Sequence, residues 1–204
     1  MSMKESNHAI QVKTVRSDFL KWDQNKMIER FALEHDEQFL YMTFFGKRYS
    51  IDRETAEVLR TEDGSEAGFS EVLTIYDMLC HSKEGARISG EWKTLATLSP
   101  HSNFGASGRD LFGRTLVKIS GKSEELHAAC QKLGGRPVTT ADVGYEFDAF
   151  DSMPIIFQFW DADDEFPANI VFLFDANTLD FIHFETAWYI AGHVLGEIVN
   201  IVES

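Results

Sequence analysis

The fold is decided by residues 143–176, VGYEFDAFDSMPIIFQFWDADDEFPANIVFLFDA. Three runs of aromatic and β-branched residues alternate here with two short turn signals, DSMP and DDEFP. Such runs are typical of strands, and links of this length join antiparallel neighbours. We therefore expect a mainly antiparallel sheet in the C-terminal half of the chain.

Amphipathic segments surround this region. From Glu185 to Val202 the apolar residues recur at helical spacing, which predicts a C-terminal helix that covers the sheet. The helical pattern of residues 123–133 is followed by Gly134-Gly135, and glycine is the residue that most readily adopts the left-handed conformation at a helix C-terminus. Helical spacing predicts helices over residues 70 to about 84, 110–119 and 123–133.

The N-terminal half predicts a helix followed by a β-hairpin. Asp18 is expected to cap a loosely amphipathic helix that ends near residues 34–36. The runs FLYMTFF and RYSID flank a tight link at Gly46-Lys47, which is typical of a hairpin. Residues 61–68 read as a loop and residues 90–108 as an irregular segment.

This order of elements predicts the α+β class, with helices and the hairpin first and most strands later. We expect a flexible N-terminus over residues 1–16 and a single α+β domain over residues 17–204. Apolar residues make up 44% of the chain, which is enough for a sizeable core.

Charge and cysteine content exclude several classes of partner. The chain has 19 basic and 33 acidic residues and a net charge of −14, which repels nucleic acid and anionic membranes. No apolar stretch is long enough for a membrane span, and residues 1–18 lack the apolar core of a signal peptide. We expect a cytoplasmic protein without nucleic-acid or membrane partners.

Cys80 and Cys130 are isolated and form no metal-binding cysteine motif.

Four acids stand within five positions of the link between the second and third strand runs. Asp161, Asp163, Asp164 and Glu165 precede Pro167, and such acids can hydrogen-bond turn amides. The segment lacks the glycine and the terminal glutamate of a calcium-binding EF-hand loop. A weaker alternative is a metal-assisted hydrolase in which Asp163, Asp164 and Glu165 hold the ion.

Seven histidines are scattered along the chain without a recognisable ligand spacing. No GxSxG nucleophile motif and no phosphate-binding glycine loop is present either. If the protein binds a metal-bearing cofactor, the axial-ligand candidates are His183, His101 and His81, in that order. A neutral imidazole would bind the metal, and its second nitrogen would then need a carboxylate or carbonyl partner.

Aromatic residues crowd the final third of the chain. Most of them should pack in a core, because alternate strand positions face apolar neighbours. They could also wall a pocket for a flat or bulky ligand. Trp160, Phe166 and Trp188 are the candidate walls.

The sequence also resembles an uncharacterised domain family of anaerobic bacteria and archaea. The resemblance runs from FFGKRYSI through IYDMLCHSKEGARISGEWKTL to the strand runs and the last helix, and covers nearly the whole chain after residue 17. Some relatives resemble fusions to an iron–sulfur module of the corrinoid-protein type, which implies redox or tetrapyrrole chemistry by association. The residues of this chain that most clearly resemble the family are Asp164, Glu165, Phe166, Pro167, Asp175 and Glu185.

Together these observations favour a binding or accessory protein for a hydrophobic planar cofactor, a corrinoid or haem, in an aromatic-lined pocket. A first alternative is an acidic module that docks a protein partner, and a second is the metal-assisted hydrolase described above. The cofactor hypothesis requires the rings of the last sixty residues to converge around a cavity.

Overall fold

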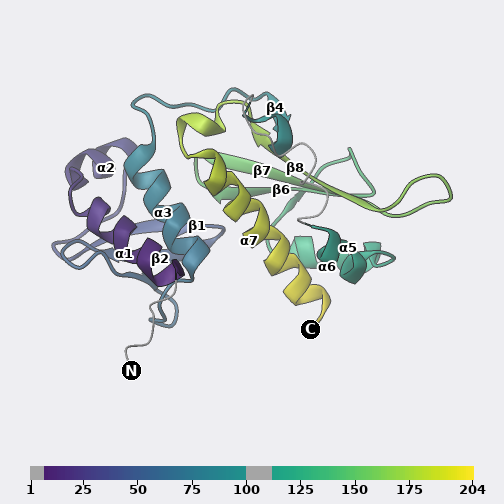
Figure 1. Ribbon diagram of the computed structural model, residues 1–204, viewed down its shortest axis with the longest axis horizontal. Coiled ribbons are helices and arrows are strands. Elements are labelled where there is room, and N and C mark those ends of the chain that lie inside the picture. The colour runs from purple at the N-terminus through teal and green to yellow at the C-terminus, as the bar shows by residue number, and fades with distance from the viewer. Residues whose placement is uncertain (1–6, 100–111) are drawn as a thin grey trace.

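A computed structural model of the chain describes residues 7–99 and 112–204. The described parts contain six helices and two antiparallel sheets, one of three and one of five strands (Figure 1). The α+β class is therefore confirmed. So is the mainly antiparallel sheet of the C-terminal half, with its covering helices.

The larger sheet is built around the three strand runs of residues 143–176. These are β6 (Val143–Phe150), β7 (Met153–Trp160) and β8 (Asn169–Asp175), paired antiparallel in chain order. Two short edge strands, β4 (Trp92–Thr94) and β5 (Arg136–Pro137), complete the order β4-β8-β7-β6-β5. Six of the eight residues of β7 are buried, so this central strand has covered neighbours on both faces.

The longest helix, α7 (Phe184–Val202), crosses the sheet diagonally in Figure 1 and carries eight buried residues. It also contacts α5 (Gly113–Ile119) and α6 (Ser123–Lys132), whose buried residues join the same apolar core. The predicted helices over residues 123–133 and from residue 185 are thus confirmed within one residue. The helix predicted to start at residue 110 begins at Gly113, and residues 110 and 111 lie outside the described part.

The smaller sheet contains the predicted hairpin, β1 (Phe39–Phe44) and β2 (Lys47–Asp52), together with β3 (Val58–Arg60). The turn is formed by Phe45 and Gly46, one residue earlier than the predicted link at Gly46-Lys47, because Lys47 already pairs with Phe44. Their φ angles of 48° and 71° are the left-handed values that suit the twist of a two-residue hairpin. The Phe45 N–H donates to the Ala149 carbonyl at 2.9 Å, so the hairpin tip is attached to β6 of the larger sheet.

Two helices replace the single N-terminal helix that the sequence predicts. α1 (Asn7–Phe19) begins well before Asp18, and its residues 7–16 fall in the segment expected to be flexible. α2 (Gln24–Phe31) is capped by Asp23, whose carboxylate accepts hydrogen bonds from the backbone N–H groups of Asn25 and Lys26. The prediction that Asp18 is the N-cap of the N-terminal helix is therefore wrong. The capping signal that decides the second helix lies five residues further along the chain.

The third helix, α3 (Phe69–His81), matches the helix predicted from residue 70 and packs against both α1 and α7. It thereby connects the N-terminal part to the C-terminal part of the core. None of the helices in the described segments combines the length and apolar character that crossing a bilayer requires.

Candidate functional site

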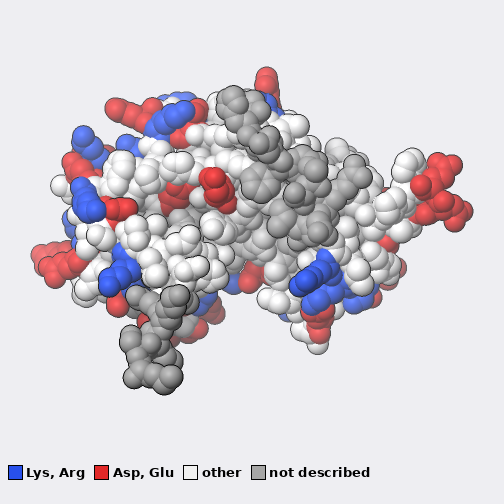
Figure 2. All heavy atoms as spheres, in the orientation of Figure 1, with Lys and Arg blue, Asp and Glu red and all other residues white. Residues whose placement is uncertain are grey.

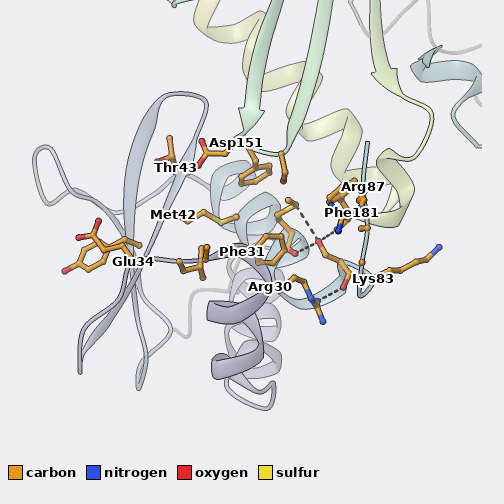
Figure 3. Close-up of a pocket in the computed structure, with 18 of the residues that line it drawn as sticks. Arg30, Phe31, Glu34, Met42, Thr43, Lys83, Arg87, Asp151 and Phe181 are labelled. Carbon is orange, nitrogen blue, oxygen red and sulfur yellow. Dashed lines mark hydrogen bonds between the residues drawn. The ribbon is translucent and has the colours of Figure 1, made fainter. Parts of the chain in front are cut away.

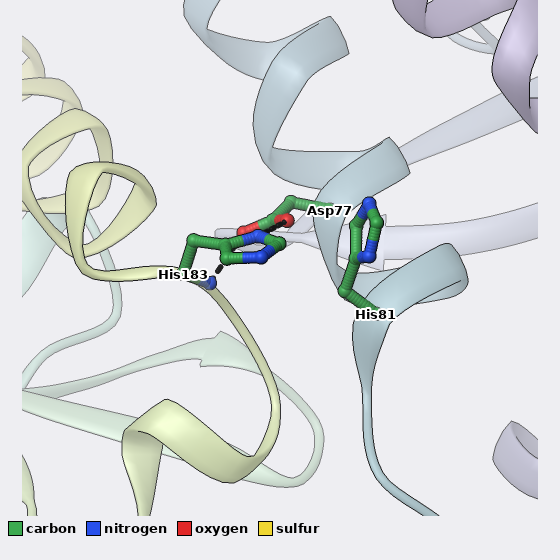
Figure 4. Close-up of side chains that lie close together, drawn as sticks. All are labelled: Asp77, His81 and His183. Atoms are coloured by element: carbon green, nitrogen blue, oxygen red, sulfur yellow. Dashed lines mark hydrogen bonds and ion pairs between the residues drawn. The ribbon is translucent and has the colours of Figure 1, made fainter.

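One end of α3 meets the start of α7 at a cluster of three titratable side chains. Asp77 and His81 are four residues apart on α3 and so project from the same helix face. His183 is the residue that precedes α7 and serves as its N-cap. One ligand atom from each of the three lies within 4.8 Å of the others, and Figure 4 shows the side chains side by side.

Backbone and hydroxyl hydrogen bonds bring these segments together. The Ser82 hydroxyl, just after α3, lies 2.9 Å from the Phe181 carbonyl and 2.7 Å from the Met78 carbonyl. The Lys83 N–H donates to the Asp180 carbonyl at 2.8 Å. Residues 180–183 are therefore fastened along the C-terminal end of α3, which fixes His183 opposite Asp77.

Asp77 orients His183 directly. Its carboxylate accepts the His183 backbone N–H at 2.7 Å and lies 2.5 Å from Nδ1 of the same residue. Because an ionised carboxylate only accepts, Nδ1 carries a proton, and in the neutral imidazole Nε2 then keeps the lone pair. This is the partner that a metal-ligating histidine needs on its second nitrogen. The Asp77 side chain is 10% exposed and that of His183 59%, so the imidazole points outward from a buried anchor.

His81 completes the cluster. Its ring centroid lies 4.5 Å from that of His183, and Trp22 covers it edge-on at 5.4 Å. Burial is the main cause that lowers the pKa of His81 below its usual value; His183 adds to this, whereas the Asp77 carboxylate opposes it. At neutral pH His81 is thus a neutral imidazole, the form that binds metals.

The cluster opens into a cavity of about 260 Å³. Three aromatic side chains, Trp22, Tyr76 and Tyr189, contribute to its walls, and Asp18 and Glu185 supply further carboxylates. Cys80 also lines it, but burial raises the pKa of that thiol to about 12, so no thiolate is present at neutral pH. The donors available to a ligand are therefore imidazoles and carboxylates.

The structure brings two of the three predicted histidine ligands together. His183 and His81 meet in the cluster, whereas His101 lies outside the described residues. Sequence reasoning missed Asp77. Its separation of four residues from His81 on a predicted helix was a usable signal, but the 106 residues between it and His183 hide the decisive contact.

The three predicted aromatic walls lie elsewhere. Trp160 ends β7, and Phe166 stands 66% exposed in the β7–β8 link. Trp188 packs on α7 near Phe112 and Phe184, with ring centroids 6.0 and 6.4 Å away. The rings of the strands themselves are core residues. In β6, β7 and β8, the phenylalanines less than 3% exposed are Phe147, Phe150, Phe157, Phe159, Phe172 and Phe174.

The acidic link between β7 and β8 forms a loop that projects from the body of the protein (Figure 1), and acidic side chains gather at its tip (Figure 2). Asp163 accepts the backbone N–H groups of Glu165 and Phe166 at 2.8 and 2.6 Å, which lower the pKa of its carboxyl. Asp164 and Glu165 are exposed. Within residues 7–99 and 112–204, Asp77, His81 and His183 form the group whose ligand atoms lie within 4.8 Å of one another, and the loop acids form no such group.

Two other family markers have defined surroundings. Asp175 is 2% exposed and accepts backbone N–H bonds from Ser89, Gly90 and Asn177 at 2.7 to 2.9 Å. It therefore ties the end of β8 to the segment before β4. Glu185 stands in the first turn of α7 and lines the cavity beside the cluster.

Comparison with family models gives one match. The model of a domain of unknown function, DUF3786, matches residues 23–197. The chain belongs to the DUF3786 family. The matched region includes both sheets and all three residues of the cluster, so this site lies within the DUF3786 domain. Comparison with curated proteins gave no match, and comparison with solved structures gave none.

Proposed function

We propose that this DUF3786 domain binds a first-row transition metal at the cluster, with His81 and His183 as ligands and Asp77 orienting His183. The observation that carries the proposal is the convergence of these side chains from α3 and the start of α7, with the carboxylate already bonded to the second nitrogen of a histidine. Metal-ligating histidines almost always donate their second ring N–H to a carboxylate, a carbonyl or a water.

The spacing of the donors is compatible with one ion. Zinc–nitrogen bonds of about 2.0–2.1 Å in tetrahedral geometry place two ligand nitrogens about 3.4 Å apart. The donors of the cluster lie within 4.8 Å of one another, and rotation of the exposed His81 side chain would shorten this separation while Asp77 holds His183 in place. Asp18, Glu185 or water would supply the remaining positions, because both carboxylates line the same cavity.

The donor types select the class of metal. Imidazole with carboxylate suits Zn²⁺, Ni²⁺, Co²⁺ and Fe²⁺, whereas Mg²⁺ and Ca²⁺ prefer oxygen donors and Cu⁺ prefers sulfur. With the Cys80 thiol protonated, the cavity offers no thiolate to a soft metal. We therefore infer a borderline divalent ion.

The metal can arrive as a free ion held by both histidines, or within a haem or corrinoid for which His183 alone would be the axial ligand. The resemblance to proteins fused to a corrinoid-type iron–sulfur module supports the second source by association. The cavity supports the first: at about 260 Å³ it is below the roughly 300–1,000 Å³ of drug-sized ligand sites. A macrocycle would extend over the exposed face of His183, whereas an ion with water fits inside.

Calorimetric titration of chelator-treated protein with Zn²⁺, Ni²⁺ and Co²⁺ tests the proposal. We expect one ion per chain, and binding weakened at least about tenfold in His183→Ala and in His81→Ala. His35→Ala removes an exposed histidine that belongs neither to the cluster nor to its cavity lining, and it should leave binding unchanged.

Absorbance spectra with haem and with a corrinoid distinguish the two sources. A ligation spectrum that disappears in His183→Ala identifies the tetrapyrrole as the carrier of the metal. The absence of both ion binding and a ligation spectrum, or binding that neither histidine variant alters, would overturn the proposal.

A further inference from the structure

A second cavity shares no lining residue with the cavity at the histidine cluster. It has a volume of about 610 Å³ and lies between the β1–β2 hairpin, the ends of α2 and α3, and the β6–β7 turn (Figure 3). This volume is within the roughly 300–1,000 Å³ typical of small-molecule sites. The cavity therefore has room for a whole organic ligand.

Four buried apolar side chains form part of its lining. Met42, Met78, Phe150 and Phe181 are at most 7% exposed, and they come from four separate segments of the chain. Two of them are methionines, whose flexible thioether side chains adapt to irregular apolar ligands. This lining would favour a ligand with an aliphatic or aromatic body.

Cationic side chains line the same cavity although the chain carries a net charge of −14. Arg48 pairs with Glu34 at 2.7 Å, and Lys83 with Asp180 at 2.6 Å, so these two charges are compensated within the protein. Arg30 instead donates to the uncharged carbonyl of Ser82.

Arg87 has no side-chain hydrogen bond or ion pair among residues 7–99 and 112–204. Two guanidinium groups, those of Arg30 and Arg87, thus keep an uncompensated positive charge at the cavity. Asp151 is the opposing acid, and Figure 3 places it at the other end of the cavity from Arg30 and Lys83. The electrostatic field along the Arg30 and Arg87 side favours an anion.

We propose that this cavity binds a small organic anion, with its carboxylate or phosphate head at Arg30 and Arg87 and its apolar body against Met42, Met78, Phe150 and Phe181. Guanidinium groups bind both head groups through paired hydrogen bonds. The site goes beyond the proposed metal binding and does not depend on it, because none of its lining residues belongs to the metal cluster.

Two fluorescent dyes of similar shape test the charge requirement. 8-Anilinonaphthalene-1-sulfonate is an anion, and N-phenyl-1-naphthylamine is its neutral counterpart. We expect the anionic dye to bind one site per chain and more tightly than the neutral dye. The Arg30→Gln, Arg87→Gln double variant should weaken the anionic dye at least about tenfold and leave the neutral dye unchanged.

Arg114→Gln is the matched control, because Arg114 is an exposed arginine on α5 that does not line the cavity. Circular dichroism of each variant establishes that it is folded. Equal affinity for the two dyes, more than one site per chain, or unchanged affinity of the anionic dye in the double variant would overturn the proposal.

Competition with octanoate and octyl phosphate then identifies the head group. The compound that displaces the anionic dye at the lower concentration carries the preferred head, and its effect should be lost in the double variant. Displacement by neither compound, or equal displacement by octanol, would contradict an anion site.

Discussion

Asp77 holds His183 by two contacts, the backbone N–H at 2.7 Å and Nδ1 at 2.5 Å. The two residues are 106 positions apart in the sequence. Asp77 lies on α3, which connects the N-terminal and C-terminal parts of the core, and His183 stands at the start of α7, which covers the larger sheet. This double contact fixes both the backbone and the imidazole of His183, which lines the cavity. The proposed metal centre depends on this arrangement.

The first prediction concerns Asp77→Asn. The amide has nearly the same shape but is a weaker acceptor at Nδ1–H, so His183 loses its fixed tautomer. Metal affinity measured by calorimetry should fall about 10- to 100-fold. Asp63→Asn is the matched control, because Asp63 is an exposed acid that belongs neither to the cluster nor to the lining of its cavity. Equal losses in the two variants would mean that Asp77 has no special role.

The second prediction concerns Asp175→Asn. The carboxylate accepts three backbone N–H groups while 2% exposed, and charge-assisted hydrogen bonds of this kind contribute about 1.5–3 kcal/mol each. We expect the free energy of unfolding in urea to fall by about 2–4 kcal/mol. Asp164→Asn, in the exposed loop, should change it by less than about 0.5 kcal/mol.

Asp175 should also make the stability of the folded protein depend on pH in the acid range. Burial opposes ionisation of Asp175, but the amide donors from Ser89, Asn177 and Gly90 outweigh it and hold the pKa of the carboxyl below its usual value. The stability it contributes is therefore present above the unfolded pKa of about 3.9 and is lost as the pH falls through the folded pKa. Wild-type protein should lose stability more steeply than Asp175→Asn below about pH 4. Parallel curves would contradict this assignment.

The third prediction concerns a buried network in the N-terminal part. The Tyr49 hydroxyl donates to Glu71 at 2.5 Å, the Gly68 N–H donates to the same carboxylate at 2.5 Å, and Arg60 pairs with it. Glu71→Ala leaves buried donors without an acceptor and should lower the free energy of unfolding by about 3–5 kcal/mol. Tyr49→Phe removes a single bond and should lower it by about 1–2 kcal/mol. A smaller loss for Glu71→Ala than for Tyr49→Phe would refute the network.

The fourth prediction concerns the joint between the hairpin tip and α7. His193 lies with its ring centroid 4.9 Å from Phe44 and 5.5 Å from Phe45. Burial lowers the pKa of His193; Glu197 and Glu71 oppose this, and Lys47 and Arg60 add to it. The unfolded chain therefore takes up the proton first as the pH falls. Stability should be greatest above about pH 6.5, the unfolded value, and should decrease as the pH falls toward the folded pKa.

His193→Phe should remove this acid dependence and keep the ring packing. Within the described residues Nε2 of His193 is buried without a hydrogen-bond partner, so its loss leaves no donor unsatisfied. Urea unfolding at pH 7.5 and 5.5 compares the two proteins. An equal difference between the two pH values in wild type and variant would contradict the role of His193.

Local sequence patterns predicted the elements that long runs define. The hairpin around Phe45-Gly46, the strands β6 to β8 and the helix α7 follow from periodicity and turn residues over six or more positions. Three short strands were missed, because β3 and β4 have three residues each and β5 has two. Such segments become strands only through pairing with a longer neighbour, which local propensity does not record.

The site was predictable only in part for a similar reason. His183 and His81 were candidate ligands because the chain has only seven histidines. The sequence around either histidine does not indicate that the other lies beside it. Their contact results from the hydrogen bonds of Ser82 and Lys83 to residues 180 and 181. The aromatic walls expected from Trp160, Phe166 and Trp188 followed from composition, which does not tell a cavity wall from a core residue.

The central claim is that a metal ion binds between His81 and His183. A crystal of the protein grown with Co²⁺, with anomalous diffraction recorded at the cobalt edge, tests it most directly. We predict one strong anomalous peak about 2.0–2.2 Å from an imidazole nitrogen of each histidine, with Asp77 still bonded to His183. A peak at other side chains, or well-ordered histidines with no peak between them, would contradict the account.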